Sequence, residues 1–296
     1  MLIADQQVFT YSMKAPIHSI LTSIVLLLAG CQSQDQVQPK LPVSLDGKQL
    51  VALGNSITAP DDSWAWVTAQ YFGMTLTNLA VSGAHLTDYY NTCVDTNEDP
   101  RYNEDNTNNV ISNQIFRLLQ MIVPAGTVIP ETDGEIFHSE TPSPLTGLRD
   151  PDSTFTPFFV IISCGTNDAA GLKAIGDISQ LDNPYQEADR KTIYGAIYWA
   201  VSVIRKYSPS TQIILLTPIQ RSPLPERLPL IVEAIQRAGE KLDCHTIDMY
   251  NESGITTEVE SQEHKYLYDG LHPNAEGSRL MGQTVIRHLQ EWYTSK

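Results

Sequence analysis

The sequence LVALGNSIT, residues 50–58, starts as an unbroken apolar run and changes character at Gly54. Four apolar residues in succession, Leu50–Leu53, are typical of a strand that is buried on both faces of a parallel sheet. Gly54 permits a tight turn, and Ser56 follows just past the carboxyl end of the strand, where open parallel sheets bind ligands. Helical spacing begins near Trp64. We therefore expect Ser56 between a strand end and a helix start, where free backbone N–H groups can face an anion.

The composition limits the kinds of partner that the chain can have. Its 296 residues are enough for one large or two small domains, and the 34 acidic against 19 basic residues give a net charge of −15. This charge argues against a nucleic acid as partner, because affinity for its backbone comes from Lys and Arg that neutralise phosphates. The same charge argues, more weakly, against an anionic lipid surface.

The N-terminal segment has the features of an export signal. Lys14 precedes an apolar run over 17–28 that is too short to span a bilayer comfortably, and small residues follow it. The run ends in Leu-Ala-Gly-Cys and so resembles the lipobox of bacterial lipoproteins, which implies cleavage before Cys31 and lipidation of that residue. Met13 is an alternative start. A buried apolar helix with a chance cysteine is the simpler alternative.

These features divide the chain into a lipoprotein signal peptide (1–30), a flexible tether (31–44) and a folded domain (45–296). The tether is polar and contains two prolines. With Cys31 lipidated, Cys93, Cys164 and Cys244 remain, an odd number that cannot all pair internally. The last two lie in strand-like apolar runs, and we expect buried free thiols there. No cysteine or histidine spacing suggests a metal site.

Strands and helices alternate along the rest of the domain, which predicts a parallel sheet with helices on both faces. Further strands are predicted over 75–81, 158–163, 212–216 and 244–249, and helices over 113–123, 187–207, 226–242 and 274–292. Ser112 is the expected N-cap of the first of these helices. The loops over 85–110 and 124–157 show no clear period, and we interpret them as pocket walls.

Residues that can offer a polar side chain or a backbone N–H follow several of the predicted strands on the same edge of the sheet: Gly83, Asn167, Asp269 and His272. Nucleophilic catalysis needs a hydroxyl, a base and a group that orients the base. Ser56 can supply the hydroxyl. His272 is the best base among seven histidines, because Asp269 lies three residues earlier and a tight turn lets its carboxylate reach Nδ1. The N–H groups of Ser56 and Gly83 and the amide of Asn167 can stabilise an oxyanion.

Each of these signals has an ordinary structural alternative. Ser56 alone reads as a helix cap, a lone histidine is more often a packing or surface residue, and both Gly165–Asp168 and Asp269-Gly270 are plausible turns. The specific feature is the order of all four groups at strand ends of one α/β sheet.

Four motifs resemble those of the SGNH/GDSL-type hydrolases of the esterase and lipase superfamily. They are Gly54-Asn55-Ser56-Ile57-Thr58, Asn78-Leu79-Ala80-Val81-Ser82-Gly83, Gly165-Thr166-Asn167-Asp168 and Asp269-Gly270-Leu271-His272-Pro273. The resemblance covers residue 50 to the C-terminus and implies a three-layer flavodoxin-like fold with five parallel strands. It implies a triad of Ser56, His272 and Asp269, an oxyanion hole of Ser56, Gly83 and Asn167, and no metal or organic cofactor. Asn55 departs from the usual Asp; an amide keeps most of the local hydrogen bonds.

The function expected on this basis is that of a serine esterase, with the deacetylation of carbohydrates as a candidate activity. A lysophospholipase or thioesterase with the same mechanism, and an inactive glycan-binding lipoprotein, are the alternatives. Tyr89, Tyr90 and Tyr102 in the polar loops favour a carbohydrate or other polar ester over a long acyl chain. The expected partners are a small-molecule or carbohydrate ester and, through the lipid anchor, a membrane of the bacterial cell envelope. We expect a monomer.

Overall fold

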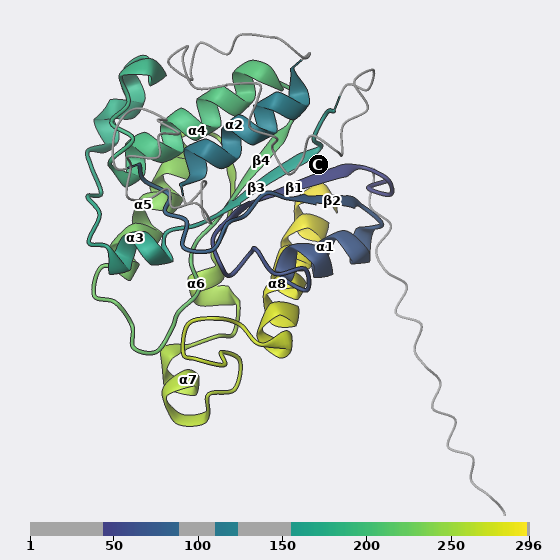
Figure 1. Cartoon of the computed structure of the whole chain (residues 1–296), viewed down its shortest axis with the longest axis vertical. Coiled ribbons are helices and arrows are strands. Elements are labelled where there is room, and N and C mark those ends of the chain that lie inside the picture. The colour runs from purple at the N-terminus through teal and green to yellow at the C-terminus, as the bar shows by residue number, and fades with distance from the viewer. Residues whose placement is uncertain (1–43, 89–109, 124–154, 295–296) are drawn as a thin grey trace, which may run out of the picture. The chain divides into compact units, whose positions relative to one another are not determined.

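A sheet of five parallel strands forms the centre of the structure, a computed structural model that describes residues 44–88, 110–123 and 155–294 (Figure 1). The strands are β1 (Gln49–Gly54), β2 (Thr75–Asn78), β3 (Phe159–Ser163), β4 (Gln212–Leu216) and β5 (His245–Ile247). All neighbours pair in parallel, in the order β2-β1-β3-β4-β5. The prediction of a five-stranded parallel sheet is confirmed.

The strands β1 and β3 are buried on both faces. Successive residues of a strand point to opposite sides of the sheet. Accordingly, Val51 and Val160 belong to one apolar cluster, while Leu50 and Phe159 belong to another on the opposite face. All residues of β3 are buried. The absence of any polar interruption in these strands is therefore explained by their place in the middle of three layers.

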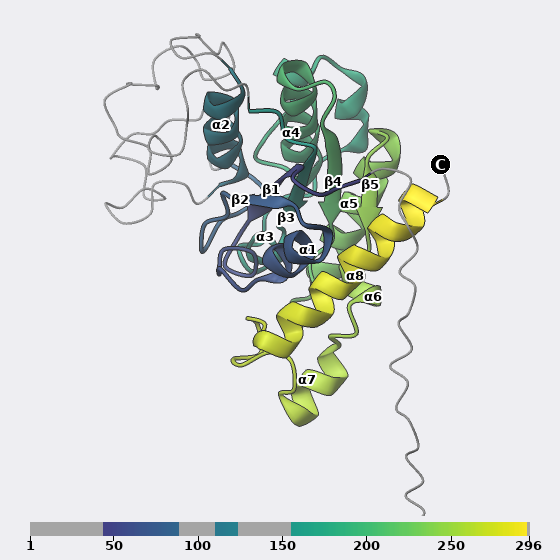
Figure 2. The same ribbon diagram turned by 90° about the vertical axis from the view of Figure 1, so that its right-hand side faces the viewer.

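Helices cover both faces, as Figure 2 shows from the side. α2 (Ile111–Ile122), α4 (Ile193–Tyr207) and α5 (Leu228–Lys241) contribute to the cluster that contains Val51. α1 (Trp64–Phe72) and α8 (Ala275–Thr294) contribute to the other cluster and lie side by side. The three-layer α/β architecture is confirmed. None of the helices in the described residues combines the length and the apolar character needed to cross a bilayer.

The start of α4 differs from the prediction. The helix begins at Ile193 rather than at 187, and two short 3-10 helices, Ile178–Asp182 and Tyr185–Glu187, precede it. Thr192 sets the boundary, because its hydroxyl accepts a hydrogen bond from the N–H of Gly195 (3.2 Å) and so caps the helix.

The prediction of Ser112 as an N-cap is wrong. Val110 occupies the cap position, and Ser112 lies in the first turn of α2. Its hydroxyl donates to the carboxylate of Asp88 (2.6 Å), so it ties α2 to a loop of the second motif region instead of closing the helix end. Cys244 is half-buried rather than buried, while Cys164 is buried; both are free thiols.

Three short helices were not predicted from the sequence: α3 (Thr166–Ala170), α6 (Met249–Glu252) and α7 (Thr257–Glu263). The strand over 212–216 has its predicted bounds, and the other predicted elements are present with shifted ends. Several predictions lie outside the described residues: the signal peptide and tether with Cys31, the residues Cys93, Tyr89, Tyr90 and Tyr102, and most of the two long loops.

Candidate active site

Ser56 lies in a tight turn directly after β1. Asn55 closes the turn: its carbonyl accepts from Thr58 N–H (2.9 Å), and its side-chain oxygen accepts from Ile57 N–H (3.0 Å). A Cβ at Gly54 would lie 2.6 Å from the carbonyl oxygen of Ser163, so only glycine fits there. Since α1 begins only at Trp64, the helix N-terminus is not adjacent to Ser56, contrary to our expectation.

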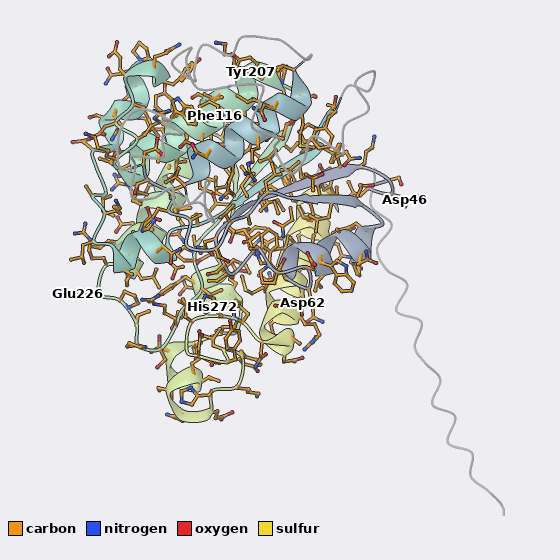
Figure 3. All side chains as sticks on the ribbon, viewed as in Figure 1. Asp46, Asp62, Phe116, Tyr207, Glu226 and His272 are labelled. Atoms are coloured by element: carbon orange, nitrogen blue, oxygen red, sulfur yellow. The ribbon has the colours of Figure 1, made fainter. Side chains whose placement is uncertain are left out.

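The structure brings Ser56, His272 and Asp269 into one chain of hydrogen bonds. Ser56 Oγ lies 2.8 Å from His272 Nε2, and His272 Nδ1 lies 2.6 Å from Asp269 Oδ2. A carboxylate can only accept, so Nδ1 carries the proton and Nε2 is left to accept from the serine hydroxyl. Figure 3 shows His272 on the side of the molecule where α6 and α7 lie. This is the arrangement that proton transfer from a serine requires.

The carboxylate of Asp269 is held in its ionised form. Burial would raise its pKa, but hydrogen bonds from the His272 ring and from the backbone N–H groups of His272 and Leu271 outweigh this effect and lower the pKa to about 2. The two backbone bonds measure 2.7 and 2.9 Å. A lowered pKa stabilises the turn at every pH above the ordinary range of Asp, and this stabilisation is lost only as the pH falls toward 2.

The segment Tyr266–Pro273, which we call the histidine loop, is fixed at both ends. The buried carboxylate of Glu260 in α7 accepts from the N–H groups of Tyr266 (2.9 Å) and Leu267 (3.0 Å). At the turn, Gly270 has φ of 81° and its carbonyl accepts from Ser222 N–H (2.9 Å). The position requires glycine, because a Cβ would lie 2.2 Å from the carbonyl oxygen of Ser222.

Gly83 and Asn167 are the other candidates for the oxyanion hole, and they are linked through Ala84, the residue that follows Gly83. Asn167 Nδ2 donates to the carbonyl oxygen of Ala84 (2.9 Å), which leaves its second N–H available for a ligand. Gly83 is exposed and has φ of 81°. The N–H of Val81 donates to the carbonyl of Gly54 (3.0 Å), so this loop also lies against the turn that carries Ser56.

Asp168 clamps the same loop to the end of β3. Its buried carboxylate accepts from the N–H groups of Leu86 (2.8 Å) and Thr87 (2.9 Å) and from the hydroxyl of Thr87 (2.8 Å). The sequence analysis placed Asp168 in the third motif and gave it no role of its own. Its position explains how a loop of glycine and small residues keeps a fixed place beside β3.

Gln114 of α2 is a residue of the site region that the sequence reading missed. Its fully buried amide pairs with both polar groups of Gly54: Gly54 N–H donates to Oε1 and Nε2 donates to Gly54 O, each at 2.8 Å. The two peptide groups on either side of the Gly54 Cα, just before Ser56, are thereby fixed. The sequence offered one signal, a polar residue on the apolar side of an amphipathic helix.

Asn55 and Cys164 lie behind the serine turn and are both buried. Cys164 Sγ donates to the carbonyl of Ala84 (3.3 Å), and Asn55 Nδ2 approaches the same sulfur at 4.0 Å. Burial, with a smaller contribution from the charge of Asp168, raises the pKa of this thiol well above its usual value. The thiol therefore stays protonated and serves as a donor, and the amide of Asn55 fits beside it without adding a second buried charge near Asp168.

A metal site was not expected from the sequence. Within the described ranges, His, Cys, Asp and Glu side chains form no group of three or more that could hold a metal ion.

Comparison with known proteins finds one family model that matches part of the chain. Residues 138–280 match the model of the GDSL-like lipase/acylhydrolase family. The matched range contains Asn167, Asp269 and His272, and it begins downstream of Ser56 and Gly83. The match confirms the resemblance to the SGNH/GDSL-type hydrolases that the sequence motifs indicated. No curated protein matches the chain.

Several solved structures share the fold. One of them is 18% identical and has a TM-score of 0.57. The match covers 84% of this chain and 99% of the other chain. A protein from Lactobacillus plantarum is 17% identical and has a TM-score of 0.52. The match covers 84% of this chain and 98% of that protein. A protein from Bacteroides ovatus described as a GDSL-like lipase is 13% identical, with a TM-score of 0.49 and coverage of 83% and 99%. At such identities the first two matches show the fold alone.

Proposed function

We propose that this chain, which matches the model of the GDSL-like lipase/acylhydrolase family over residues 138–280, is a serine esterase that cleaves carboxylic esters through Ser56, His272 and Asp269. The observation that carries the proposal is the pair of contacts from Ser56 Oγ to His272 Nε2 (2.8 Å) and from His272 Nδ1 to Asp269 Oδ2 (2.6 Å). A serine, a histidine and a carboxylate in this order are what a nucleophilic hydrolase needs.

In the first half-reaction, Ser56 Oγ attacks the carbonyl carbon of the ester while its proton moves to His272 Nε2. The tetrahedral intermediate collapses when the bond to the alcohol oxygen breaks, and the histidine returns the proton to that oxygen. In the second half-reaction, water attacks the acyl-serine, His272 takes the proton of the water, and Ser56 is regenerated with release of the acid. Asp269 keeps the imidazole in the tautomer that both steps require.

The charge that develops on the carbonyl oxygen needs fixed donors. We assign this task to the N–H groups of Ser56 and Gly83 and to the second amide N–H of Asn167. The hydrogen bond from Asn167 to Ala84 (2.9 Å) and the clamp formed by Asp168 support this assignment, because they hold the donors in place before the charge appears.

For the substrate we propose a polar ester, with an acetylated carbohydrate as the first choice. Hydrolysis of an ester panel from acetyl to long-chain acyl groups, on sugar, glycerol and thiol leaving groups, tests this choice. Preference for acetyl sugars supports it, whereas preference for long-chain or thioester substrates indicates a lysophospholipase or thioesterase. Absence of turnover on the whole panel, with binding of a glycan retained, would favour the inactive glycan-binding alternative.

We further propose that the protein is a lipoprotein of the bacterial cell envelope, anchored through Cys31. The basis is the sequence alone: Lys14, the apolar run over 17–28 and the Leu-Ala-Gly-Cys end. Cys31→Ala should abolish incorporation of labelled fatty acid and move the protein from the membrane fraction to the soluble one. Cys93→Ala is the matched control and should keep the label. A wild-type protein that carries no label and stays soluble would contradict the proposal.

A further inference from the structure

The loop between β4 and α5 carries two arginines with unusual surroundings. The Nε atoms of Arg221 and Arg227 are buried and have no hydrogen-bond partner among the described residues. Four other arginines of the described residues differ from these two because they form ion pairs with carboxylates: Arg190, Arg237, Arg279 and Arg287. A guanidinium that is partly removed from water without a counter-charge is costly, so it is a candidate for a ligand that supplies the charge.

This loop lies against the histidine loop. Ser222 N–H donates to the carbonyl oxygen of Gly270 (2.9 Å), two residues before His272, and the backbones are close enough that only glycine fits at 270. A second anchor fixes the other side, since Thr257 Oγ1 donates to the carbonyl oxygen of Arg221 (3.1 Å). Arg221 thus directly precedes Ser222, the residue that contacts the histidine loop and its proposed catalytic base.

The side chain of Arg221 is suited to bind an anion. Burial lowers its pKa, and no neighbouring carboxylate counters this effect. Arginine nevertheless keeps its charge in proteins. Because Nε is covered while the residue as a whole is only half-buried, the terminal amino groups are the part of the fork that is open to a ligand.

We propose that Arg221 forms an anion subsite beside His272 and that it binds a carboxylate or phosphate group carried by the ester substrate. The inference rests on the proposed esterase function and narrows it to esters of acidic sugars or of phosphorylated alcohols. Planar carboxylates and phosphates both match the two parallel donors of a guanidinium. The experiment therefore needs one arm for each anion.

Binding is measured first, by calorimetry on the Ser56→Ala protein, so that turnover does not interfere. The probes are glucuronate against glucose, and glycerol 3-phosphate against glycerol. We expect one of the two anions to bind at least about tenfold more tightly than its neutral counterpart, and Arg221→Gln to remove that preference. Arg221→Lys should keep part of it, because it keeps the charge but not the fork.

Arg237→Gln is the control, since Arg237 lies on α5, is half-exposed and pairs with Glu233 at 3.7 Å. It should leave the preference unchanged. A parent protein that binds neither anion overturns the subsite. An Arg221→Gln variant that is folded by circular dichroism and binds the anion as tightly as its parent also overturns it.

Kinetics on the Ser56-containing enzyme then separate this subsite from the esterase function. The substrates are acetylated methyl glucuronide and methyl glucoside, and 1-acetylglycerol 3-phosphate and monoacetin. Arg221→Gln should lower kcat/KM for the preferred charged ester at least about tenfold more than for its neutral counterpart, chiefly through KM. Equal losses on both would contradict the subsite. If the wild type hydrolyses none of the four esters, the esterase proposal is in question, and the binding result alone decides the subsite.

Discussion

The turn that carries Ser56 is held by buried side chains from distant elements, whereas the short turn from Asp269 to His272 is closed by its own residues. Only the loop around that turn is anchored elsewhere, by Glu260 and Ser222. Gln114 of α2 pairs with Gly54 on the serine side, at a separation of 60 residues. On the histidine side, Asp269 bonds to Leu271 and to both the backbone and ring of His272, all within three residues. The serine side thus depends on packing of the whole domain, and the histidine side depends on a local turn.

The side chains that hold the two turns also differ in how far they are exposed to solvent. Asn55, Gln114 and Asp168 are at most 2% exposed, but the side chain of Asp269 is 43% exposed. Buried hydrogen bonds fix a position more tightly, and they cost more when one partner is removed. We therefore expect mutations on the serine side to combine losses of activity with losses of stability, and mutations in the exposed histidine turn to affect mainly activity.

The largest effect is expected for Ser56→Ala. Loss of the nucleophile should lower kcat by about 10⁴–10⁶-fold. Because Ser56 is only half-buried and a single oxygen is removed, the melting temperature should stay close to that of the wild type. Ester hydrolysis and thermal unfolding measure the two quantities. Near-normal turnover would remove the assignment of the nucleophile, and Ser82→Ala, a serine in the second motif, is the matched control.

Asn167→Ala should come next, with a fall in kcat of about 10²–10³-fold and little change in KM, since the contact strengthens mainly in the transition state. Asn167→Asp should be at least as damaging, because a carboxylate repels the oxyanion. Steady-state kinetics on an acetyl ester provide the measurement. An unchanged kcat with a raised KM would show instead that Asn167 only binds substrate.

These two sites were accessible from the sequence because they follow long apolar strands. The strand over 212–216 was predicted with its observed bounds, and Ser56, Asn167 and His272 each occur in a short motif beside a recognisable strand or turn. In such places the local pattern and the tertiary position agree. The parallel sheet then brings the ends of its strands to one edge, so their proximity could be inferred without a structure.

The supporting residues were not accessible for a physical reason. Gln114 and Glu260 bind backbone groups, and a backbone group has no signature in the sequence. Ser112 was assigned to a helix cap because capping and side-chain pairing use the same hydroxyl, and only the tertiary position of Asp88 decides between them. The short helices α6 and α7 are polar and lack the apolar period that identifies longer helices.

An intermediate effect, on both stability and kcat, is expected for Gln114→Leu on the serine side. The change leaves the N–H of Gly54 buried without a partner, which should cost about 1–3 kcal/mol of unfolding free energy. Displacement of the Ser56 turn should also lower kcat by roughly 10–100-fold at nearly constant KM. Urea unfolding and kinetics on the same ester provide both numbers.

The same substitution at Gln120, two turns further along α2, is the control and should leave kcat unchanged. Gln114→Glu tests the mechanism more finely. It keeps an acceptor for Gly54 N–H, loses the donor to Gly54 O and buries a carboxyl group. A Gln114→Leu enzyme that is destabilised but fully active would mean that the pairing supports the fold and does not position the nucleophile.

The smallest effect is expected for Tyr268→Ala on the histidine side. The ring of Tyr268 stacks on His272 with centroids 5.6 Å apart and an interplanar angle of 17°, but the residue is 69% exposed. Its N–H bonds to the carbonyl of His272 (3.0 Å), and this backbone contact survives in the alanine variant, as do the three bonds of Asp269. An exposed stacking contact lies at the weak end of aromatic pairs, so kcat should fall by no more than about threefold. Tyr268→Phe, which keeps the ring, should match the wild type. A loss of about a hundredfold in Tyr268→Ala, with Tyr268→Phe unaffected, would mean that the imidazole depends on a side chain outside its turn, and the contrast between the two halves of the site would fail.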